Sequence, residues 1–245
     1  MTPIDPKADL GYGPFSLTFD TVFVAMTLTF ALWMILRCLV FKDRFLQRDL
    51  YRYSCTTTWL MRRILGVRVE VRGLENLPKD KAFIMASKHM SWLDPIMSLQ
   101  YTPSVRGLAK KELFSIPLVG KVLALMENIR VDREAGKAGL AMNKIAEQLT
   151  ASTRPLMIYP EGTRLKPGET KSLKAGVFHL HQASGLDVVP IKTNSGWHWR
   201  GVGSKTSRGT IIYDIQPTLP HTDDKSAFME SLEGVLADSL PANPA

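Results

Sequence analysis

The chain has 245 residues, of which 45% are hydrophobic and 22% charged, a composition typical of one globular domain rather than a disordered chain. Its two cysteines, Cys38 and Cys55, give neither a disulfide framework nor a metal-binding spacing, and this suits a reducing compartment. The formal net charge of +8 indicates an anionic partner. A membrane surface or a phosphorylated small molecule fits better than nucleic acid, because the basic residues lie in no groove-reading or base-stacking motif.

An apolar segment near the N-terminus predicts a membrane-embedded helix. Thr21 to Leu36 contains no charge, and as a helix it would span about 24 Å, less than the roughly 30 Å of a hydrocarbon core. Extension to Phe41 gives about 31 Å if Arg37 snorkels to the interface. The segment would then span the bilayer or lie in one leaflet. A buried core helix is the alternative, whereas a cleaved signal peptide fits poorly because acidic residues precede the segment.

A basic region follows the apolar segment. It contains Lys42, Arg44, Arg48, Arg52, Arg62, Arg63, Arg68 and Arg72. This excess would keep the rest of the chain on the cytoplasmic side of a spanning helix, or meet anionic headgroups if the helix does not span. Tyr51 to Leu65 predicts a second helix, for which an arginine-rich solvated face is the alternative. We therefore expect residues 1–66 to be membrane-associated helices, at the inner membrane of a bacterium.

From Val67 onward, short β-branched runs alternate with longer helical ones, which is typical of α/β architecture. Strands are expected at Val67–Val71, Ala82–Ala86, Val105–Leu108, Asn128–Val131, Leu156–Tyr159, Val188–Lys192 and Gly209–Ile215. Helices are expected at Pro95–Gln100, Ile116–Leu125, Ala135–Ser152, Ser172–Ala183 and Asp223–Ser239. This pattern predicts that residues 67–245 form an α/β domain with a mixed, largely parallel sheet of about seven strands flanked by helices.

Polar residues follow three of the predicted strands. His89 comes after the apolar run AFIMAS, the stretch YPEGTR comes after PLMIY, and VPIKTNSG also leaves a strand with polar groups. Ligand sites in such sheets gather at the carboxyl ends of the strands. We therefore expect these three segments to meet at one edge.

His89 and Asp94 form an H-x-x-x-x-D pattern that allows two interpretations. On a regular helix the two side chains would point about 140° apart, so they meet only if His89 lies in a loop and Asp94 at a helix start. Asp94 followed by Pro95 is a good N-cap signal, which favours that arrangement. The aspartate would then fix the histidine tautomer and leave the second ring nitrogen as a base. Alternatively, Asp94 only caps the helix and His89 is a structural histidine.

The stretch YPEGTR, residues 159–164, suits a phosphate monoester. Arg164 can bind phosphate as a fork, Gly162 and Thr163 offer close backbone approach and a hydroxyl, and Glu161 can hold the arginine or accept from a substrate hydroxyl. A surface turn with an ion pair is the alternative. Further cations lie in IRVDRE and SLKAGVF and beside His89, and each alone is more often a solvated charge. They are Arg130, Arg133, Lys174 and Lys88.

HMSWLDP, IRVDRE, YPEGTRL and VVPIKT, in this order and at these separations, resemble the four blocks of the glycerolipid acyltransferase family, best known for 1-acyl-sn-glycerol-3-phosphate acyltransferases. The similarity covers roughly Val67 to Thr193. It implies that His89 is the general base and Asp94 its orienter. It also implies that Pro190 shapes the acyl site and that a further set of residues holds the acceptor's phosphate. That set is Arg133, Glu161, Gly162, Thr163 and Arg164.

The resemblance implies direct acyl transfer from acyl-CoA or acyl-carrier protein to a lysophospholipid, without a cofactor or metal. The chain departs from the family pattern at Lys88, where asparagine is usual, in the second block around Arg130, and at Leu165, where serine is frequent. Extra charge at Lys88 and Arg130 leaves the acceptor open. Lysophosphatidic acid is expected first, with another lyso-lipid, including an amino-acid-based lipid, or a CoA-independent transacylase as alternatives. An inactive membrane-anchored lipid-binding protein is the alternative from another class.

Overall fold

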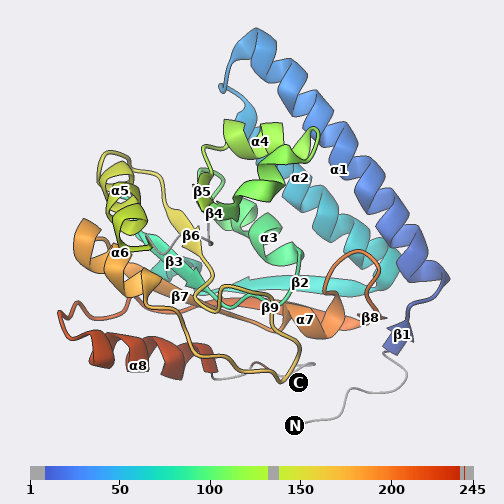
Figure 1. Ribbon diagram of the computed structural model, residues 1–245. Helices are drawn as coiled ribbons and strands as arrows, with labels where there is room; N and C mark the ends of the chain where they lie inside the picture. Colours follow the sequence, from blue (N-terminus) through green and yellow to red (C-terminus); the bar gives the residue numbers. More distant parts are fainter. Residues whose placement is uncertain (1–8, 132–137, 238–239, 241–245) are drawn as a thin grey trace.

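The computed structural model of the protein describes residues 9–131, 138–237 and 240 (Figure 1). The strands are β1 Asp9–Gly11, β2 Val67–Arg72, β3 Ile84–Ser87, β4 Arg106–Lys110, β5 Ile129–Val131, β6 Leu156–Ile158, β7 Val188–Thr193, β8 Thr206–Ser207 and β9 Gly209–Ile215. The α-helices are α1 Pro14–Phe41, α2 Leu46–Leu60, α3 Leu93–Tyr101, α4 Val119–Leu125, α5 Ala138–Thr150, α6 Gly176–Ser184, α7 Ser195–His198 and α8 Lys225–Ala237. One π-helical turn, Met61–Leu65, and two 3₁₀ turns, Leu74–Asn76 and Lys111–Ser115, complete the elements.

Seven strands form the main sheet in the order β2-β9-β7-β3-β6-β4-β5. All neighbouring pairs are parallel except β7 and β9, which are antiparallel. The predicted mixed, largely parallel sheet of about seven strands is confirmed. The antiparallel pair of β1 and β8 was not predicted. Strands of three and two residues are too short to show a periodic pattern in the sequence.

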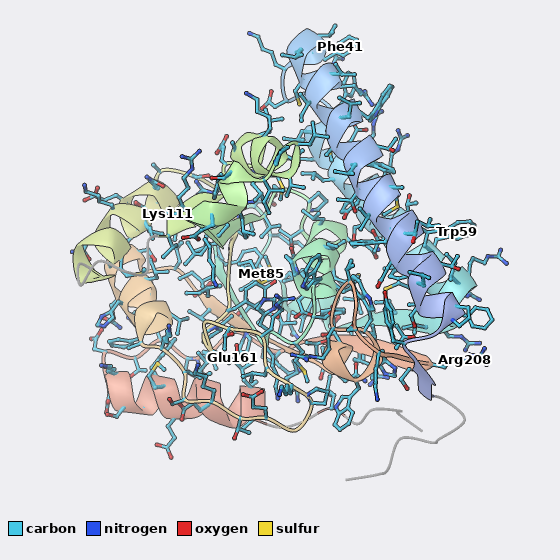
Figure 2. The ribbon with its side chains drawn as sticks, turned by 45° about the vertical axis from the view of Figure 1, so that its right-hand side comes forward. Phe41, Trp59, Met85, Lys111, Glu161 and Arg208 are labelled. Atoms are coloured by element: carbon cyan, nitrogen blue, oxygen red, sulfur yellow. The ribbon has the colours of Figure 1, made fainter. Side chains whose placement is uncertain are left out.

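Side chains alternate between the two faces of the sheet and form a hydrophobic cluster on each. Ile84 and Ala86 of β3 join α5, α6 and α8 on one face. Met85 points to the other face, where α1 to α4 pack, and Figure 2 shows it in the interior. The period of two residues along a strand produces this division. Figure 1 shows the same layers, with α8 and α6 on one side of the sheet and α1 to α4 on the other.

Helix α1 is longer than the charge-free run from which it was predicted. It begins at Pro14, a favourable first position, and its 28 residues extend about 42 Å. Among the described residues, α1 is the one helix that is both long enough and apolar enough to cross a membrane. Only 17% of its most apolar 18-residue stretch is buried. The alternative of a buried core helix is therefore wrong.

Arg37 lies inside α1 and has a partner within the protein. Its Nη1 lies 3.0 Å from Oδ1 of Asp49 in α2, and its guanidinium packs on the rings of Trp33 and Phe45. The arginine side chain is largely buried, and the charge of Asp49 compensates it within the protein.

The N-terminal part of α1 is anchored to the α/β domain by Trp199. This indole is fully buried, and the rings of Phe19 and Phe23 meet it edge-on at 5.3 and 5.2 Å. A hydroxyl–hydroxyl contact of 2.7 Å between Ser16 and Thr206 adds a polar link beside it. The apolar helix and the sheet domain thus share one packed interface.

We predict that Trp199→Ala lowers the free energy of unfolding by about 3–5 kcal/mol, because it leaves a large cavity between α1 and the sheet domain. Thermal or denaturant unfolding in detergent micelles measures the loss. Trp59→Ala is the matched control, because Trp59 is exposed, and we expect it to change stability by less than about 1 kcal/mol. Equal losses in the two variants would contradict the anchoring role.

Candidate active site

The carboxyl ends of β7, β3 and β6 bring the predicted polar segments together. These three strands are adjacent and parallel in the sheet. His89 follows β3, Tyr159 to Arg164 follow β6, and Asn194 and Ser195 follow β7. The expected meeting of three strand ends at one edge is what the topology shows.

His89 and Asp94 contact each other directly. Nδ1 of His89 lies 2.9 Å from Oδ2 of Asp94, with His89 in the loop after β3 and Asp94 in the first turn of α3. The histidine side chain keeps 18% of its surface exposed, whereas the aspartate side chain is fully buried. In the neutral tautomer whose Nδ1 donates to the carboxylate, Nε2 carries no proton and can act as a base.

The loop between the two residues is shaped by Asp94 itself. Its Oδ2 also accepts from the backbone N–H groups of Met90, at 2.7 Å, and Ser91, at 2.8 Å. The expectation that Asp94 is the N-cap and Pro95 the first helical residue is wrong by two positions, because α3 begins at Leu93. The carboxylate folds the loop back over the first helical turn instead of capping the helix.

Two residues that the sequence analysis missed hold the other carboxylate oxygen. Ser195 Oγ donates to Asp94 Oδ1 at 2.6 Å, and Tyr213 Oη donates to the same atom at 2.9 Å. Both are fully buried. Tyr213 belongs to β9, which runs antiparallel to β7 and places Tyr213 opposite Thr193, at the carboxyl end of β7. Asp94 therefore accepts five hydrogen bonds, which replace the hydration of a buried carboxylate and fix its position.

Tyr159 orients the histidine ring from its face. The two rings stack with their centroids 4.0 Å apart and their planes 21° apart. Burial raises the pKa of the Tyr159 phenol well above its ordinary value, so the ring remains neutral. In the sequence, Tyr159 ends an expected strand and begins YPEGTR, and neither position gave a sign of this contact.

Glu161 lies in the turn after β6 and is buried. Burial raises its pKa to about 7, while backbone N–H groups and the charge of Lys88 act in the opposite direction. Lys88 and Glu161 line a cavity of about 300 Å³ together with Glu233 and Leu236 of α8. Figure 2 labels Glu161 near α8, in the long loop between β6 and α6.

The remaining residues of the turn are held close to the histidine. The N–H of Leu165 donates to the carbonyl of His89 at 2.8 Å. Gly162 has a φ of 68°, and a Cβ there would lie 2.8 Å from Cε of Lys174, so Lys174 packs against the turn. Thr163 and Arg164 are exposed.

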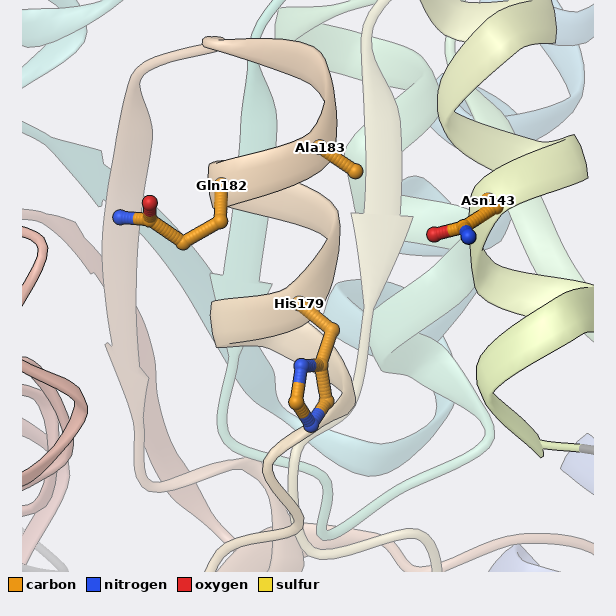
Figure 3. A pocket seen from close by; sticks show the side chains of 4 residues that line it. All are labelled: Asn143, His179, Gln182 and Ala183. Atoms are coloured by element: carbon orange, nitrogen blue, oxygen red, sulfur yellow. The ribbon is translucent and has the colours of Figure 1, made fainter.

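Arg130 and Pro190 lie within strands rather than in the loop and helix that carry the pair. Arg130 is in β5, the edge strand three positions from β3 and so about 14 Å away, where its guanidinium packs on Phe114. Pro190 is buried in β7 opposite Ala86. Arg133 lies outside the described residues. A second hollow, of about 360 Å³, is lined by Asn143, His179, Gln182 and Ala183 of α5 and α6 (Figure 3), none of which was predicted for the site.

Residues 68–194, slightly more than half of the chain, match the family model described as Acyltransferase. The chain belongs to the acyltransferase family. A 1-acyl-sn-glycerol-3-phosphate acyltransferase of Pseudomonas aeruginosa is 34% identical over 179 residues, which are 72% of this chain and 67% of that protein. An enzyme of the same name from Limnanthes douglasii is 29% identical over 74% of this chain and 66% of its own length. The chain thus spans about two thirds of the length of these relatives.

A solved structure agrees with the fold. The crystal structure of the 1-acyl-sn-glycerophosphate acyltransferase PlsC from Thermotoga maritima matches this acyltransferase-family chain with a TM-score of 0.76 over 91% of each chain, at 20% identity. The resemblance stated from the four sequence blocks is confirmed at the level of family and fold.

We predict that Tyr213→Phe lowers kcat for acyl transfer about ten-fold, because one hydrogen bond to the charged Asp94 is lost. The acceptor KM should change little, since Tyr213 is buried behind the pair. Steady-state kinetics of the purified enzyme checks this. Tyr101→Phe is the control, because the buried Tyr101 hydroxyl has no hydrogen-bond partner among the described residues. Equal kcat values for Tyr213→Phe and wild type would contradict the prediction.

Glu161 predicts a dependence of stability on pH. Its folded pKa of about 7 lies above the ordinary 4.5, so between these values the folded state binds more protons than the unfolded chain. The free energy of unfolding should therefore fall as pH rises through this window, by at most about 3 kcal/mol. Unfolding of wild type and Glu161→Gln at pH 4.5 to 7.5 measures the difference, with exposed Glu169→Gln as control. Parallel curves for wild type and Glu161→Gln would contradict the prediction.

Proposed function

We propose that this protein transfers a fatty acyl group from acyl-CoA or acyl-carrier protein to the free hydroxyl of 1-acyl-sn-glycerol-3-phosphate, giving phosphatidic acid. The observation that carries the proposal is the His89–Asp94 pair, whose buried carboxylate is fixed by five hydrogen bonds and whose histidine is partly exposed. Two relatives are 1-acyl-sn-glycerol-3-phosphate acyltransferases, which supports this acceptor.

The reaction follows from the geometry of the pair. Nε2 of His89 takes the proton of the acceptor hydroxyl as the hydroxyl oxygen attacks the thioester carbonyl carbon. The tetrahedral intermediate then breaks its carbon–sulfur bond, and the leaving thiolate recovers the proton from His89. An ester replaces a thioester, and no acyl-enzyme is needed. Asp94 stabilises the imidazolium between the two proton transfers.

The turn after β6 supports an acceptor that carries phosphate. Arg164 is exposed beside the His89 loop, and Lys174 packs against Gly162, so two cations flank the turn. Thr163 offers a hydroxyl on the same turn. Arg133 remains a proposed phosphate ligand from the family resemblance alone. Holding the phosphate would place the free hydroxyl near His89, and such positioning contributes much of the rate enhancement.

The apolar helix supports a membrane location, which suits a lipid acceptor and a lipid product. Most of the large apolar side chains of α1 are exposed, among them Phe15, Trp33 and Phe41. We propose that α1 and α2, within residues 1–66, form the membrane-associated part. Because α2 returns along α1 to the sheet domain, we propose that the basic residues that follow α1 meet anionic headgroups, with residues 67–245 on the cytoplasmic side of a bacterial inner membrane.

Incubation of purified protein in vesicles with labelled acyl-CoA or acyl-carrier protein and a panel of lyso-lipids tests the proposal. Labelled phosphatidic acid formed from lysophosphatidic acid is the expected product. A labelled product from another lyso-lipid only would overturn the acceptor. Acyl transfer without any thioester donor would indicate a transacylase. Release of free fatty acid alone would indicate a hydrolase, and absence of all turnover would indicate a lipid-binding protein.

We predict that His89→Ala lowers kcat by about 10² to 10⁴-fold, because it removes the general base. The variant should keep its unfolding midpoint, since the His89 ring is partly exposed. His179→Ala is the matched control, because this histidine is exposed on α6. Product formation by His89→Ala at the wild-type rate would contradict the assigned role.

A further inference from the structure

The loop of residues 199–204 lies beside the first turns of α1 and connects this helix to the His89 loop. Trp199 is packed by α1, and its carbonyl accepts from Ser91 Oγ at 2.5 Å. The next carbonyl, of Arg200, accepts from the N–H of Trp92 at 3.2 Å. Gly203 N–H donates to Asp20 of α1 at 2.7 Å. Arg200 is therefore held between the first turns of α1 and the loop that carries the catalytic histidine.

The indole of Trp92 brings two arginines into one neighbourhood. The guanidinium carbon of Arg164 lies 5.4 Å from the centre of the Trp92 ring. On the Arg200 side, a Cβ added to Gly201 would lie 2.6 Å from the same ring, so the Arg200–Gly201 turn packs directly against it. The pKa of Arg164 is lowered first by burial and then by the charge of Arg200, which agrees with their proximity.

Neither guanidinium is neutralised within the part of the chain that the structure describes. No described side chain forms an ion pair with Arg164 or Arg200, and Nε of Arg200 is buried without a hydrogen-bond partner. Two like charges held together, with a buried donor unsatisfied, are unfavourable until an anion arrives. By contrast, Arg37 and Arg154 have carboxylate partners at 3.0 and 2.9 Å.

We propose that Arg200 joins Arg164 in one anion site that binds the phosphate monoester of the acceptor, with Trp92 as the platform between them. This rests on the proposed function and deepens it, because it adds Arg200 as a residue that selects the acceptor. A phosphate monoester approaches two negative charges near neutral pH, whereas the phosphodiester of a zwitterionic lyso-lipid carries one. Two guanidinium groups favour the former, and each matches phosphate geometry as a fork.

The position of the site fits a lipid headgroup. Exposed apolar side chains of the α1 region, Tyr12, Phe15 and Leu17, surround the foot of the helix to which the Arg200 loop is bound. Figure 1 shows α7 and β8, which flank this loop, next to the start of α1. A lipid whose chain lies along α1 would place its phosphate near the N-terminal end of this helix, beside the Arg200 loop.

Kinetics with two acceptors tests the proposal. Arg200→Gln should raise the KM for lysophosphatidic acid at least ten-fold with little change in kcat, because binding is weakened and the base is untouched. The preference for lysophosphatidic acid over lysophosphatidylethanolamine should fall at least ten-fold. Arg200→Lys should recover part of both, since it keeps the charge and loses the fork. Lys205→Gln, which removes an exposed charge from the same loop, should change neither.

Arg164 provides a second readout. In one anion site, Arg164→Gln combined with Arg200→Gln should raise the KM by a factor that differs from the product of the two single effects. Independent effects in the double variant, or an unchanged KM and preference in Arg200→Gln, would overturn the proposal. An equal loss for both acceptors together with a lowered unfolding midpoint would also overturn it, because it indicates a purely structural arginine.

A binding measurement separates this proposal from the proposed function. sn-Glycerol 3-phosphate should raise the unfolding midpoint of wild type more than glycerophosphoethanolamine does, and Arg200→Gln should abolish the difference. This result would support the anion site even if no lyso-lipid were acylated, in which case the proposed function alone would fail. Equal stabilisation of wild type and Arg200→Gln by sn-glycerol 3-phosphate would overturn the anion site, whatever the enzyme acylates.

Discussion

The buried carboxylate of Asp94 is the interaction on which the site depends. An ionised carboxylate taken out of water is unfavourable by several kcal/mol unless hydrogen bonds replace its hydration. Here the donors come from the His89–Ser91 loop, from Ser195 at the start of α7, and from Tyr213 in β9. One charged group therefore holds three segments of the chain together, and it fixes the histidine tautomer at the same time.

The order of the strands makes this possible. Because β7 lies between β3 and β9, a group at the end of β3 has the end of β7 beside it and the antiparallel β9 next in line. At the edge where the parallel strands end, those strands contribute the residues that come after them. The antiparallel β9 passes this edge and contributes a residue from within the strand, Tyr213. Tyr213 reaches Asp94 for this reason, and a fully parallel sheet would have placed another residue there.

Local pattern predicted the strands of the main sheet, left two interpretations for His89 and Asp94, and gave no sign of the residues that support them. The seven strands follow from β-branched runs, and the contact between His89 and Asp94 required that the first lie in a loop and the second at a helix start. Ser195 and Tyr213 lie 101 and 119 positions from Asp94, so their contacts depend on strand register rather than on any local signal. The start of α3 was misplaced because Asp-Pro signals a helix start, while here the carboxylate serves the preceding loop.

The start of α1 was placed too late for a related reason. The charge of Asp20 comes directly before the apolar run, yet α1 begins at Pro14 and Asp20 accepts from the N–H of Gly203. A partner of this kind cannot be deduced from hydropathy, because it requires knowing that the loop after Trp199 folds against α1.

The shared core also bears on how the apolar helix and the site are related. Phe19 of α1, Leu50 of α2 and Met85 of β3 belong to one hydrophobic cluster, so the change of sequence pattern near Val67 is not a break in packing. Trp199 lies in the same cluster, and its carbonyl holds Ser91, one of the backbone donors to Asp94. A continuous chain of contacts thus runs from α1 through Trp199 to the carboxylate. Displacement of α1 would expose Phe19 and Trp199 and loosen the loop that carries His89, so the integrity of the site depends on a helix that contributes no residue to the His89–Asp94 pair.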